Sequence, residues 1–112
     1  HCLSSAASDV YKRQLRDYMH IIDICRALKI VIDEGDVNTI YNIASGESLP
    51  FRKILEIVRD KLNSQSKFIP ISTPRFNQLT IPKNCSLNVD KLKSLGFTPS
   101  IDLHEGLQSL CR

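Results

Sequence analysis

The stretch RDYMHIID, residues 16–23, decides how the chain folds, because the spacing of its apolar residues changes within it. Polar and apolar residues alternate up to Ile21, which is the pattern of a half-buried strand. From Ile21 onward the apolar positions recur at helical spacing. We therefore predict a short strand over residues 17–21, followed by a helix. Arg16 stands at the start of this junction, where a guanidinium can meet an anionic ligand.

Apolar residues at three- and four-residue spacing extend the predicted helix to Ile32. Further apolar residues on its other sides predict a helix that is buried on more than one face. Asp23 near its start suits the helix dipole, and Gly35 provides a stop at its end. Residues 37–43 are rich in β-forming side chains and predict a strand. Strand, helix and strand of this length indicate an α/β unit.

A second, amphipathic helix is predicted after Ser48, which would be its N-cap, with Pro50 in its first turn. Its apolar stripe is that of a core-facing helix in contact with solvent. The apolar stripe of this helix consists of Phe51, Ile54, Leu55, Val58 and Leu62.

Residues 67–71 predict a strand, which Pro70 places at an edge of its sheet.

The end of the chain predicts two short helices. Residues 90–95 form the first, and Gly96 ends it with Pro99 beyond. Asp102 and Glu105 stand three residues apart before an apolar run, which is the spacing of a capping box. These carboxylates are explained as helix-capping charges and need no role in acid–base chemistry.

Three motifs in order resemble one known family. RDYMHIIDICRA at 16–27, YNIASGE at 41–47 and LGFTP at 95–99 are similar to the C-terminal part of extended short-chain dehydrogenase/reductases. These are the NAD-dependent epimerases and dehydratases that act on nucleotide sugars. The resemblance implies that residues 15–47 form the last strand–helix–strand of an NAD-binding Rossmann domain. Residues 48–112 would then form a small α/β substrate-binding lobe.

The resemblance also implies a ligand role for residues of the first motif. Arg16 matches an arginine that contacts the nucleotide diphosphate, and paired guanidinium donors suit phosphate oxygens. A surface arginine paired with Asp17 or Asp23 is the alternative. Tyr18 either lines the nucleotide pocket or serves only in packing. His20 is predicted to lie on a strand without a partner acid, so a structural role is favoured over that of a general base.

Residues 73–78 form a turn-rich loop that matches a second substrate-binding segment of the family. Arg75 corresponds to a second arginine on the diphosphate. Gln78 stands where the family has an aspartate that holds a ribose hydroxyl. A glutamine can still hydrogen-bond a hydroxyl, but the departure leaves the identity of the nucleotide open.

Two features of the family's chemistry are missing from the sequence. The four glycines, Gly35, Gly46, Gly96 and Gly106, are isolated and form no phosphate-cradling motif. No tyrosine is followed four residues later by a lysine. We therefore assign no catalytic, cofactor-binding or metal-binding residue. The full-length parent is expected to use NAD or NADP, whereas the present chain alone is expected to be inactive and to bind no cofactor.

The first fourteen residues carry no helical or strand pattern. SSAASDVYKRQ at 4–14 looks like the in-frame translation of a transposase sequencing adaptor. Residues 1–14 are therefore expected to be a non-native, disordered segment, with a genuine flexible tail as the alternative. The parent would then extend upstream, and its missing Rossmann portion would be a partner of this chain. Without that portion, apolar surface of the helix over residues 22–32 is expected to be exposed.

The composition excludes several other classes of function. A net charge of +3 without a run of like charges argues against nucleic acid, and no apolar run approaches the roughly 18 residues of a membrane span. The four cysteines are far apart, which favours a reducing cytoplasm. The parent is expected to be a homodimer. Two alternatives stay open: a self-contained non-catalytic α/β binding module, and a related reductase acting on a non-nucleotide substrate.

Overall fold

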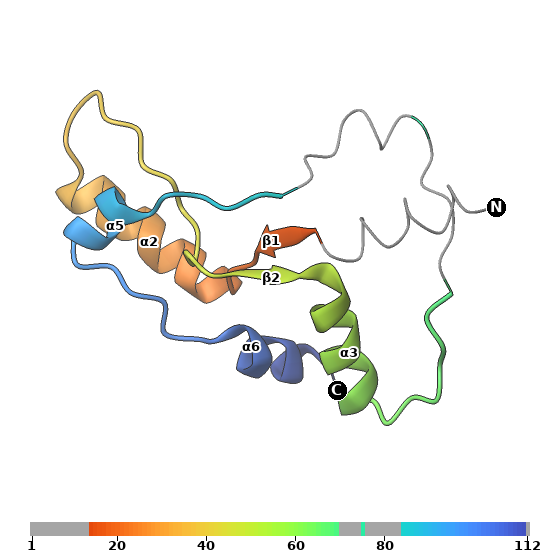
Figure 1. Cartoon of the computed structure of the whole chain (residues 1–112). Helices are drawn as coiled ribbons and strands as arrows, with labels where there is room; N and C mark the ends of the chain where they lie inside the picture. Colours follow the sequence, from red (N-terminus) through yellow and green to blue (C-terminus); the bar gives the residue numbers. More distant parts are fainter. Residues whose placement is uncertain (1–13, 70–74, 76–83, 112) are drawn as a thin grey trace.

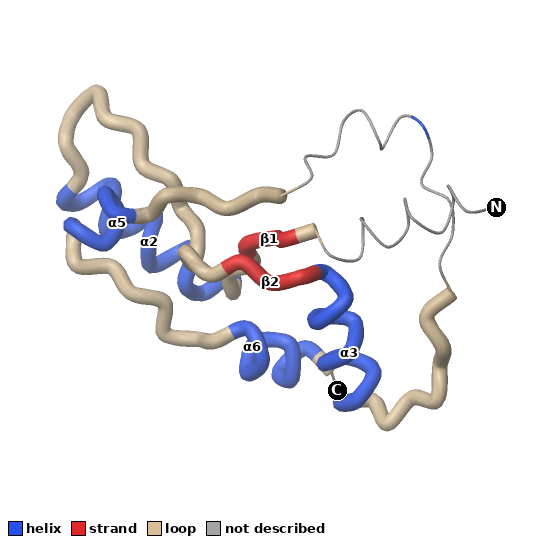
Figure 2. The backbone as a smooth tube through the Cα atoms, in the orientation of Figure 1, coloured by secondary structure: helices blue, strands red, loops and turns tan. Residues whose placement is uncertain are grey.

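The computed structural model describes residues 14–69, 75 and 84–111. A two-stranded ribbon lies in the middle of these residues, with helices on both sides (Figures 1 and 2). Among the described residues, no helix has the length and apolar character needed to cross a bilayer. The elements are β1 (Leu15–Asp17), α2 (Ile21–Glu34), β2 (Ser48–Pro50), α3 (Phe51–Lys61), α5 (Asp90–Ser94) and α6 (Leu103–Leu110).

The ribbon brings three distant parts of the chain together. β1 pairs antiparallel with β2, and Arg16 lies opposite Leu49. The Leu15 carbonyl accepts from the Cys85 N–H at 3.0 Å, and the Leu15 N–H donates to Asn84 Oδ1 at 3.1 Å. Backbone groups of β1 that β2 does not pair are thereby satisfied. The ribbon and the 84–85 segment thus form one hydrogen-bonded unit, and α3 packs against its strand β2.

The junction between β1 and α2 differs from the prediction. The strand lies at 15–17 rather than 17–21, whereas the helix begins at Ile21, where the helical spacing starts. His20, which was predicted to lie on a strand, is the N-cap of α2, and its Nδ1 accepts from the Ile22 N–H at 3.3 Å. A capping side chain satisfies an N–H group that has no partner within the helix, which favours helix over strand here.

The main core lies between α2, α5 and the turn that follows α5. Ala27 on α2 and Leu92 on α5 are both fully buried, and Phe97 is 2% exposed. Ala27, which has only a methyl group, packs with Leu92 and Phe97 in one buried cluster. Burying side chains such as Leu92 and Phe97 contributes about 1.5–3 kcal/mol each. The partly buried residues around this core are Met19, Ile30, Val31 and Ile43.

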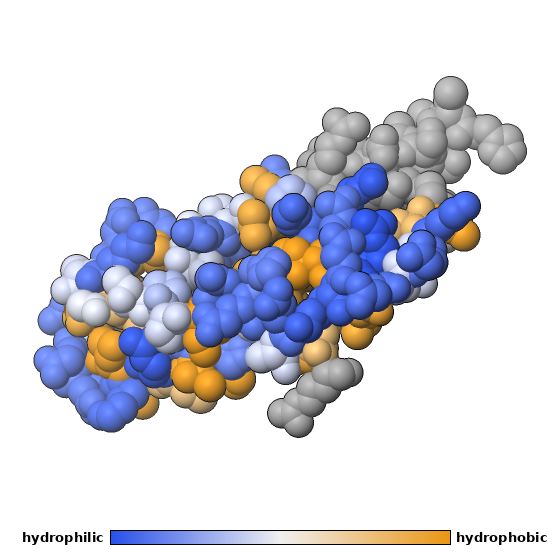
Figure 3. All heavy atoms as spheres, turned by 90° about the horizontal axis from the view of Figure 1, so that it is seen from below, coloured by the Kyte–Doolittle hydropathy of each residue, from blue (hydrophilic) through white to orange (hydrophobic). Residues whose placement is uncertain are grey.

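The other faces of α2 are exposed. Only Asp23 and Ala27 are buried in this helix, whereas Ile21 is 64% and Ile32 is 80% exposed. The prediction of a helix buried on more than one side is therefore wrong for this chain, because no described segment covers those faces. The expected exposure of its apolar surface is confirmed. Figure 3 shows hydrophobic residues exposed among hydrophilic ones at the end of the molecule formed by α2 and α5.

Two predicted strands are absent from the described residues. Residues 37–43 run as a loop in which Val37 is 87% and Ile40 is 82% exposed, so that prediction is wrong. A strand needs a hydrogen-bonding neighbour, and no described segment pairs with this one. Residues 67–69 are not a strand either, and residues 70–71 lie outside the described part.

The entry to α3 also differs from the prediction. Ser48 is in β2 and is not the N-cap, and Pro50 precedes the first turn as the residue that caps it. The pairing of β2 with β1 holds the backbone extended as far as Pro50. The amphipathic helix itself is confirmed. Ile54 is its most buried residue, and α3 packs against both β2 and α6.

The two C-terminal helices agree with the prediction. α5 ends before Gly96, whose φ of +87° suits a glycine at this position. Asp102 caps α6 by accepting from the Glu105 N–H at 2.7 Å, as the capping spacing predicts. This cap fixes the start of α6, and residues 98–103 and 105 line the cavity described next.

Candidate ligand-binding site

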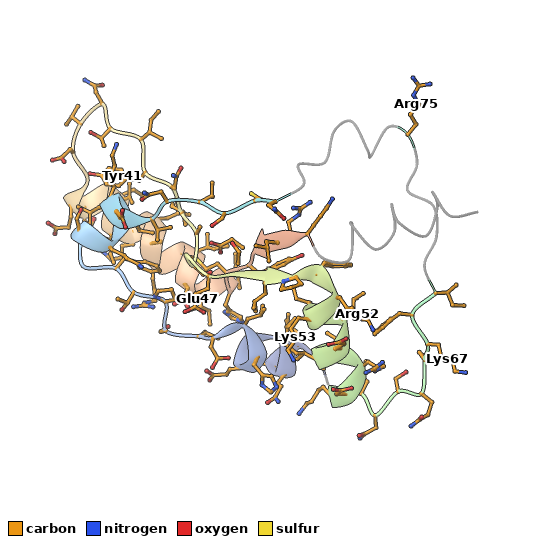
Figure 4. All side chains as sticks on the ribbon, viewed as in Figure 1. Tyr41, Glu47, Arg52, Lys53, Lys67 and Arg75 are labelled. Atoms are coloured by element: carbon orange, nitrogen blue, oxygen red, sulfur yellow. The ribbon has the colours of Figure 1, made fainter. Side chains whose placement is uncertain are left out.

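A cavity of about 420 Å³ opens where β1, β2 and the chain between α5 and α6 meet. Its lining comes from three stretches of the chain, so it combines residues of both predicted segments, 15–47 and 48–112. Glu47, one of these residues, lies between α2 and α6 in Figure 4. The lining residues are Arg16, Tyr18, Met19, Ser45, Gly46, Glu47, Leu49, Lys93, Thr98, Pro99, Ser100, Ile101, Asp102, Leu103 and Glu105.

Asp17 holds the wall of the cavity that contains the turn at 45–46. Its Oδ1 accepts from the Ser45 N–H at 2.9 Å and from Ser45 Oγ at 2.6 Å. Its Oδ2 accepts from the Gly46 N–H at 2.9 Å. Gly46 has a φ of +80°, and a Cβ there would lie 2.8 Å from Val89 Cγ2, so the turn requires glycine.

Asp23 holds a second wall, the one that contains residues 100–101. It is fully buried at the start of α2, and it accepts from the N–H groups of Ser100 and Ile101, both at 2.9 Å. Ser100 Oγ donates at 2.7 Å and Arg26 at 2.5 Å. Burial raises the pKa of Asp23, but hydrogen bonds from Ser100 Oγ, the Ile101 N–H, Arg26 and the Ser100 N–H outweigh it and lower the pKa to about 2.

Arg16 projects from β1 and is half-buried at the edge of the cavity. Its guanidinium donates to the Leu15 carbonyl at 3.0 Å and to Gln14 Oε1 at 2.9 Å. These contacts orient the guanidinium. A guanidinium has five N–H donors, which lets it bind an anion while it keeps such neighbours.

Tyr18 lies at the boundary between this cavity and a smaller apolar one of about 170 Å³. The smaller cavity includes His20 and residues of α6 such as Leu107. Arg16 and Tyr18, the two residues of the first motif for which the resemblance implies a ligand role, thus line the same cavity. Their role toward a ligand stays a prediction.

The structure does not place the second predicted arginine at this cavity. Arg75 is exposed and is not among the lining residues, and Figure 4 shows it pointing away from the helices and the ribbon. Gln78 lies outside the described residues. The proposed roles of Arg75 and Gln78 remain predictions.

Sequence reasoning missed several residues of the site. It treated Asp17 and Asp23 only as neighbours of Arg16 and as a helix-start charge, and it assigned no role to Lys93 or Glu47. The hydrogen bonds of Asp23 reach residues 77 and 78 positions away, which no local pattern reveals. The sequence did offer one indication of their importance, because Asp17 and Asp23 both lie in the family-like motif at 16–27.

The described residues do not fit a nicotinamide dinucleotide. Gly46 is in a turn whose N–H already donates to Asp17, Gly96 ends a helix, and Gly106 lies within α6. None of these three stands at a helix N-terminus where successive N–H groups could hold a diphosphate. Among the described residues no group of His, Cys, Asp and Glu is arranged to hold a metal ion. We derive no chemical step through either group.

Comparison with known proteins shows which fold and which relatives the chain resembles. No family model matches the sequence. In the solved structures, RMD from Pseudomonas aeruginosa in complex with NADPH is 16% identical with a TM-score of 0.78, covering 99% of this chain and 41% of that one. UDP-glucose 4-epimerase from Thermotoga maritima with UDP-glucose is 22% identical with a TM-score of 0.77, covering 87% and 30%. The fold is the α/β fold of extended short-chain dehydrogenase/reductases, as predicted.

The curated relatives define the family more closely. The chain is 29% identical over 98 residues to dTDP-4-dehydro-6-deoxyglucose reductase of Escherichia coli. This alignment covers 87% of the present chain and 30% of the reductase. The homologues of the chain are members of the NAD-dependent epimerase/dehydratase family, which confirms the family resemblance stated from the sequence. The chain spans about 30% of the length of the curated relatives that it matches.

Proposed function

We propose that this chain is the substrate-binding C-terminal portion of an NAD(P)-dependent nucleotide-sugar epimerase or dehydratase, and that it is inactive by itself. One observation carries the proposal: Arg16 and Tyr18 meet at a cavity whose two walls come from distant parts of the chain. Relatives named for dTDP-, GDP- and UDP-linked sugars support the class of substrate.

The charges around the cavity suit a ligand with an anionic part and a hydroxyl-rich part. Arg16 and Lys93 are cations that attract a diphosphate. Glu47 and Glu105 are carboxylates, which accept hydrogen bonds from sugar hydroxyls. A nucleotide sugar carries both kinds of group. We propose that the arginine of β1 contacts the diphosphate and that Tyr18 lines the nucleotide pocket.

The remaining parts of the proposal concern the parent protein. Arg75 and Gln78 would contact the diphosphate and a ribose hydroxyl. NAD or NADP would be held by the missing Rossmann portion; the P. aeruginosa neighbour was solved with NADPH. We propose a cytoplasmic, homodimeric parent; the free cysteines Cys25, Cys85 and Cys111 are compatible with a reducing compartment.

The test begins by recovering the coding sequence upstream of residue 15 from the source DNA and expressing the parent. Calorimetric titration with UDP-glucose, dTDP-glucose and GDP-mannose should show binding of at least one of them. Arg16→Ala should weaken that binding several-fold or more, because a charge-assisted contact to the diphosphate is lost. Arg75→Ala should do the same.

Arg52→Ala provides a matched control. Arg52 is an exposed arginine of α3 that pairs with Glu56 and does not line the cavity, so its loss should leave the affinity unchanged. Equal affinity in the wild type, Arg16→Ala and Arg75→Ala would count against the assignment. Turnover without binding of any nucleotide sugar would favour a reductase with another substrate. An upstream frame lacking both the glycine motif and the tyrosine–lysine pair would favour a non-catalytic module.

A further inference from the structure

Asp17 and Asp23 bracket the segment that leads from β1 into α2, and each holds a different wall of the cavity. Asp17 accepts three hydrogen bonds from Ser45 and Gly46, and Asp23 accepts three from Ser100 and Ile101. These partners line the cavity, whereas neither aspartate is itself a lining residue. The two carboxylates thus connect two walls, at 45–46 and at 100–101, that are about 55 positions apart in sequence.

We propose that Asp17 and Asp23 are positioning residues that set the separation of the two walls, so that ligand affinity depends on both although neither contacts the ligand. The proposal rests on the proposed function for the class of ligand, a nucleotide sugar. In this proposal, the short segment between Asp17 and Asp23 acts as a spacer of fixed length between the two walls.

The chemistry of the contacts requires a carboxylate at both positions. Each aspartate uses both oxygens as acceptors toward backbone N–H groups and a serine hydroxyl. An asparagine offers one acceptor oxygen and presents an NH₂ group where the second oxygen would stand. The amide NH₂ would then face an N–H donor, and that wall would lose at least one of its hydrogen bonds. Arg26, on the same helix as Asp23, adds a cation to that carboxylate.

The segment between the aspartates is itself held in place. β1 is paired as far as Asp17, and His20 caps α2. The His20 ring packs against Gly106, where a Cβ would lie 3.2 Å from the ring Cδ2. A larger side chain there would push the ring, the N-cap and α6 apart. The spacer therefore cannot lengthen or slide without breaking contacts with the ribbon and with α6.

The binding experiment uses the 112-residue chain and UDP-glucose as the probe. Asp17→Asn should lower the affinity about tenfold, because the wall at 45–46 would be in its binding geometry in only a fraction of the molecules and the apparent affinity falls by that fraction. Ile54→Val is the matched control: it trims a core residue of α3 that does not line the cavity, and it should lower stability without changing affinity. Both variants are measured at a temperature where circular dichroism shows them folded.

Amide hydrogen exchange tests the same inference without a ligand. In Asp17→Asn the Ser45 and Gly46 amides should exchange at least roughly tenfold faster, while the amides of α3 stay unchanged. Asp23→Asn should do the same to Ser100 and Ile101; if that variant does not fold, Asp17→Asn alone decides. Unchanged exchange at 45–46, or unchanged affinity in a chain that binds UDP-glucose, overturns the inference. Faster exchange at 45–46 in a chain that does not bind UDP-glucose supports the positioning role and counts against a UDP-linked sugar as the ligand.

Discussion

A single residue, Asp23, shows how this chain stabilises a charge away from solvent. Burial by itself disfavours the ionised carboxylate, and four surrounding donors reverse that preference. The balance depends on donors 77 and 78 positions further along the chain. The charge of Asp23 is therefore tied to the formation of the tertiary structure and not to its helix alone.

The first prediction concerns pH. The pKa of Asp23 is lowered from 3.8 to about 2, so its contribution to stability is complete above its unfolded value and is lost as the pH falls toward 2. Asp23→Asn should lose about 1–3 kcal/mol of unfolding free energy at neutral pH. Its stability should also change less than that of the wild type between pH 4 and pH 2. Urea denaturation across this range measures both effects.

Asp33→Asn is the control for the pH experiment, since Asp33 is exposed and pairs with Lys29 on the surface of α2. Removing a surface pair of this kind changes stability by less than about 1 kcal/mol. If Asp23→Asn and the wild type lose stability in parallel below pH 4, the hydrogen-bonded carboxylate is not the group responsible.

The second prediction compares two glycines with positive φ. Gly46 and Gly96 have φ of +80° and +87°, but only at Gly46 would a Cβ meet another atom closer than 3 Å. Gly96→Ala should cost about 1 kcal/mol, from backbone strain alone. Gly46→Ala should cost more, because Val89 must also move. Thermal unfolding of the two variants measures the difference, and an equal loss would mean that the turn yields without strain.

At the scale of elements, local signals in the sequence were sufficient for the helices. Asp102 with Glu105 predicted the start of α6, and Gly96 predicted the end of α5. The strands could not be predicted in the same way, because β1 and β2 exist through pairing with each other. The β-forming residues at 37–43 lack such a partner among the described residues and do not form a strand.

The third prediction tests the one-sided burial of α2. Ala27→Leu should destabilise the fold by about 1–3 kcal/mol, because Ala27 is fully buried against the core that contains Leu92 and Phe97. Ile32→Lys should change stability by no more than about 0.5 kcal/mol, since Ile32 is 80% exposed. Chemical denaturation of both variants distinguishes the faces. A large loss in Ile32→Lys would show that this face is covered.

At the scale of the whole molecule, the sequence predicted the fold class, and two residues that it singled out as ligand contacts, Arg16 and Tyr18, line the same cavity. Each lies in a motif that is readable along the chain. The walls of the cavity could not be predicted, because contacts of Asp17 and Asp23 across 28 to 78 positions create them. Hydrogen bonds between residues so far apart in sequence follow only from the complete arrangement of the helices and strands.

The fourth prediction concerns the apolar surface of the whole chain. Ile32 and Ile40 are both at least 80% exposed, and apolar surface of this kind favours association between molecules. The chain should therefore self-associate as its concentration rises. The double variant Ile32→Lys and Ile40→Lys should reduce that association, as measured by sedimentation velocity. Lys29→Glu, a charge change on the same helix at an already polar position, is the control and should have less effect.

The contact between Asp23 and Ser100 also has a consequence for the order in which the chain folds. Closing a loop of 77 residues costs roughly 4 kcal/mol of chain entropy, so this contact is disfavoured until other structure shortens the effective loop. α2, α5 and the β1–β2 ribbon can form across shorter separations. The Asp23 contacts then form late, and their loss should accelerate unfolding more than it slows folding. Stopped-flow kinetics of Asp23→Asn would show this as a change confined mainly to the unfolding arm.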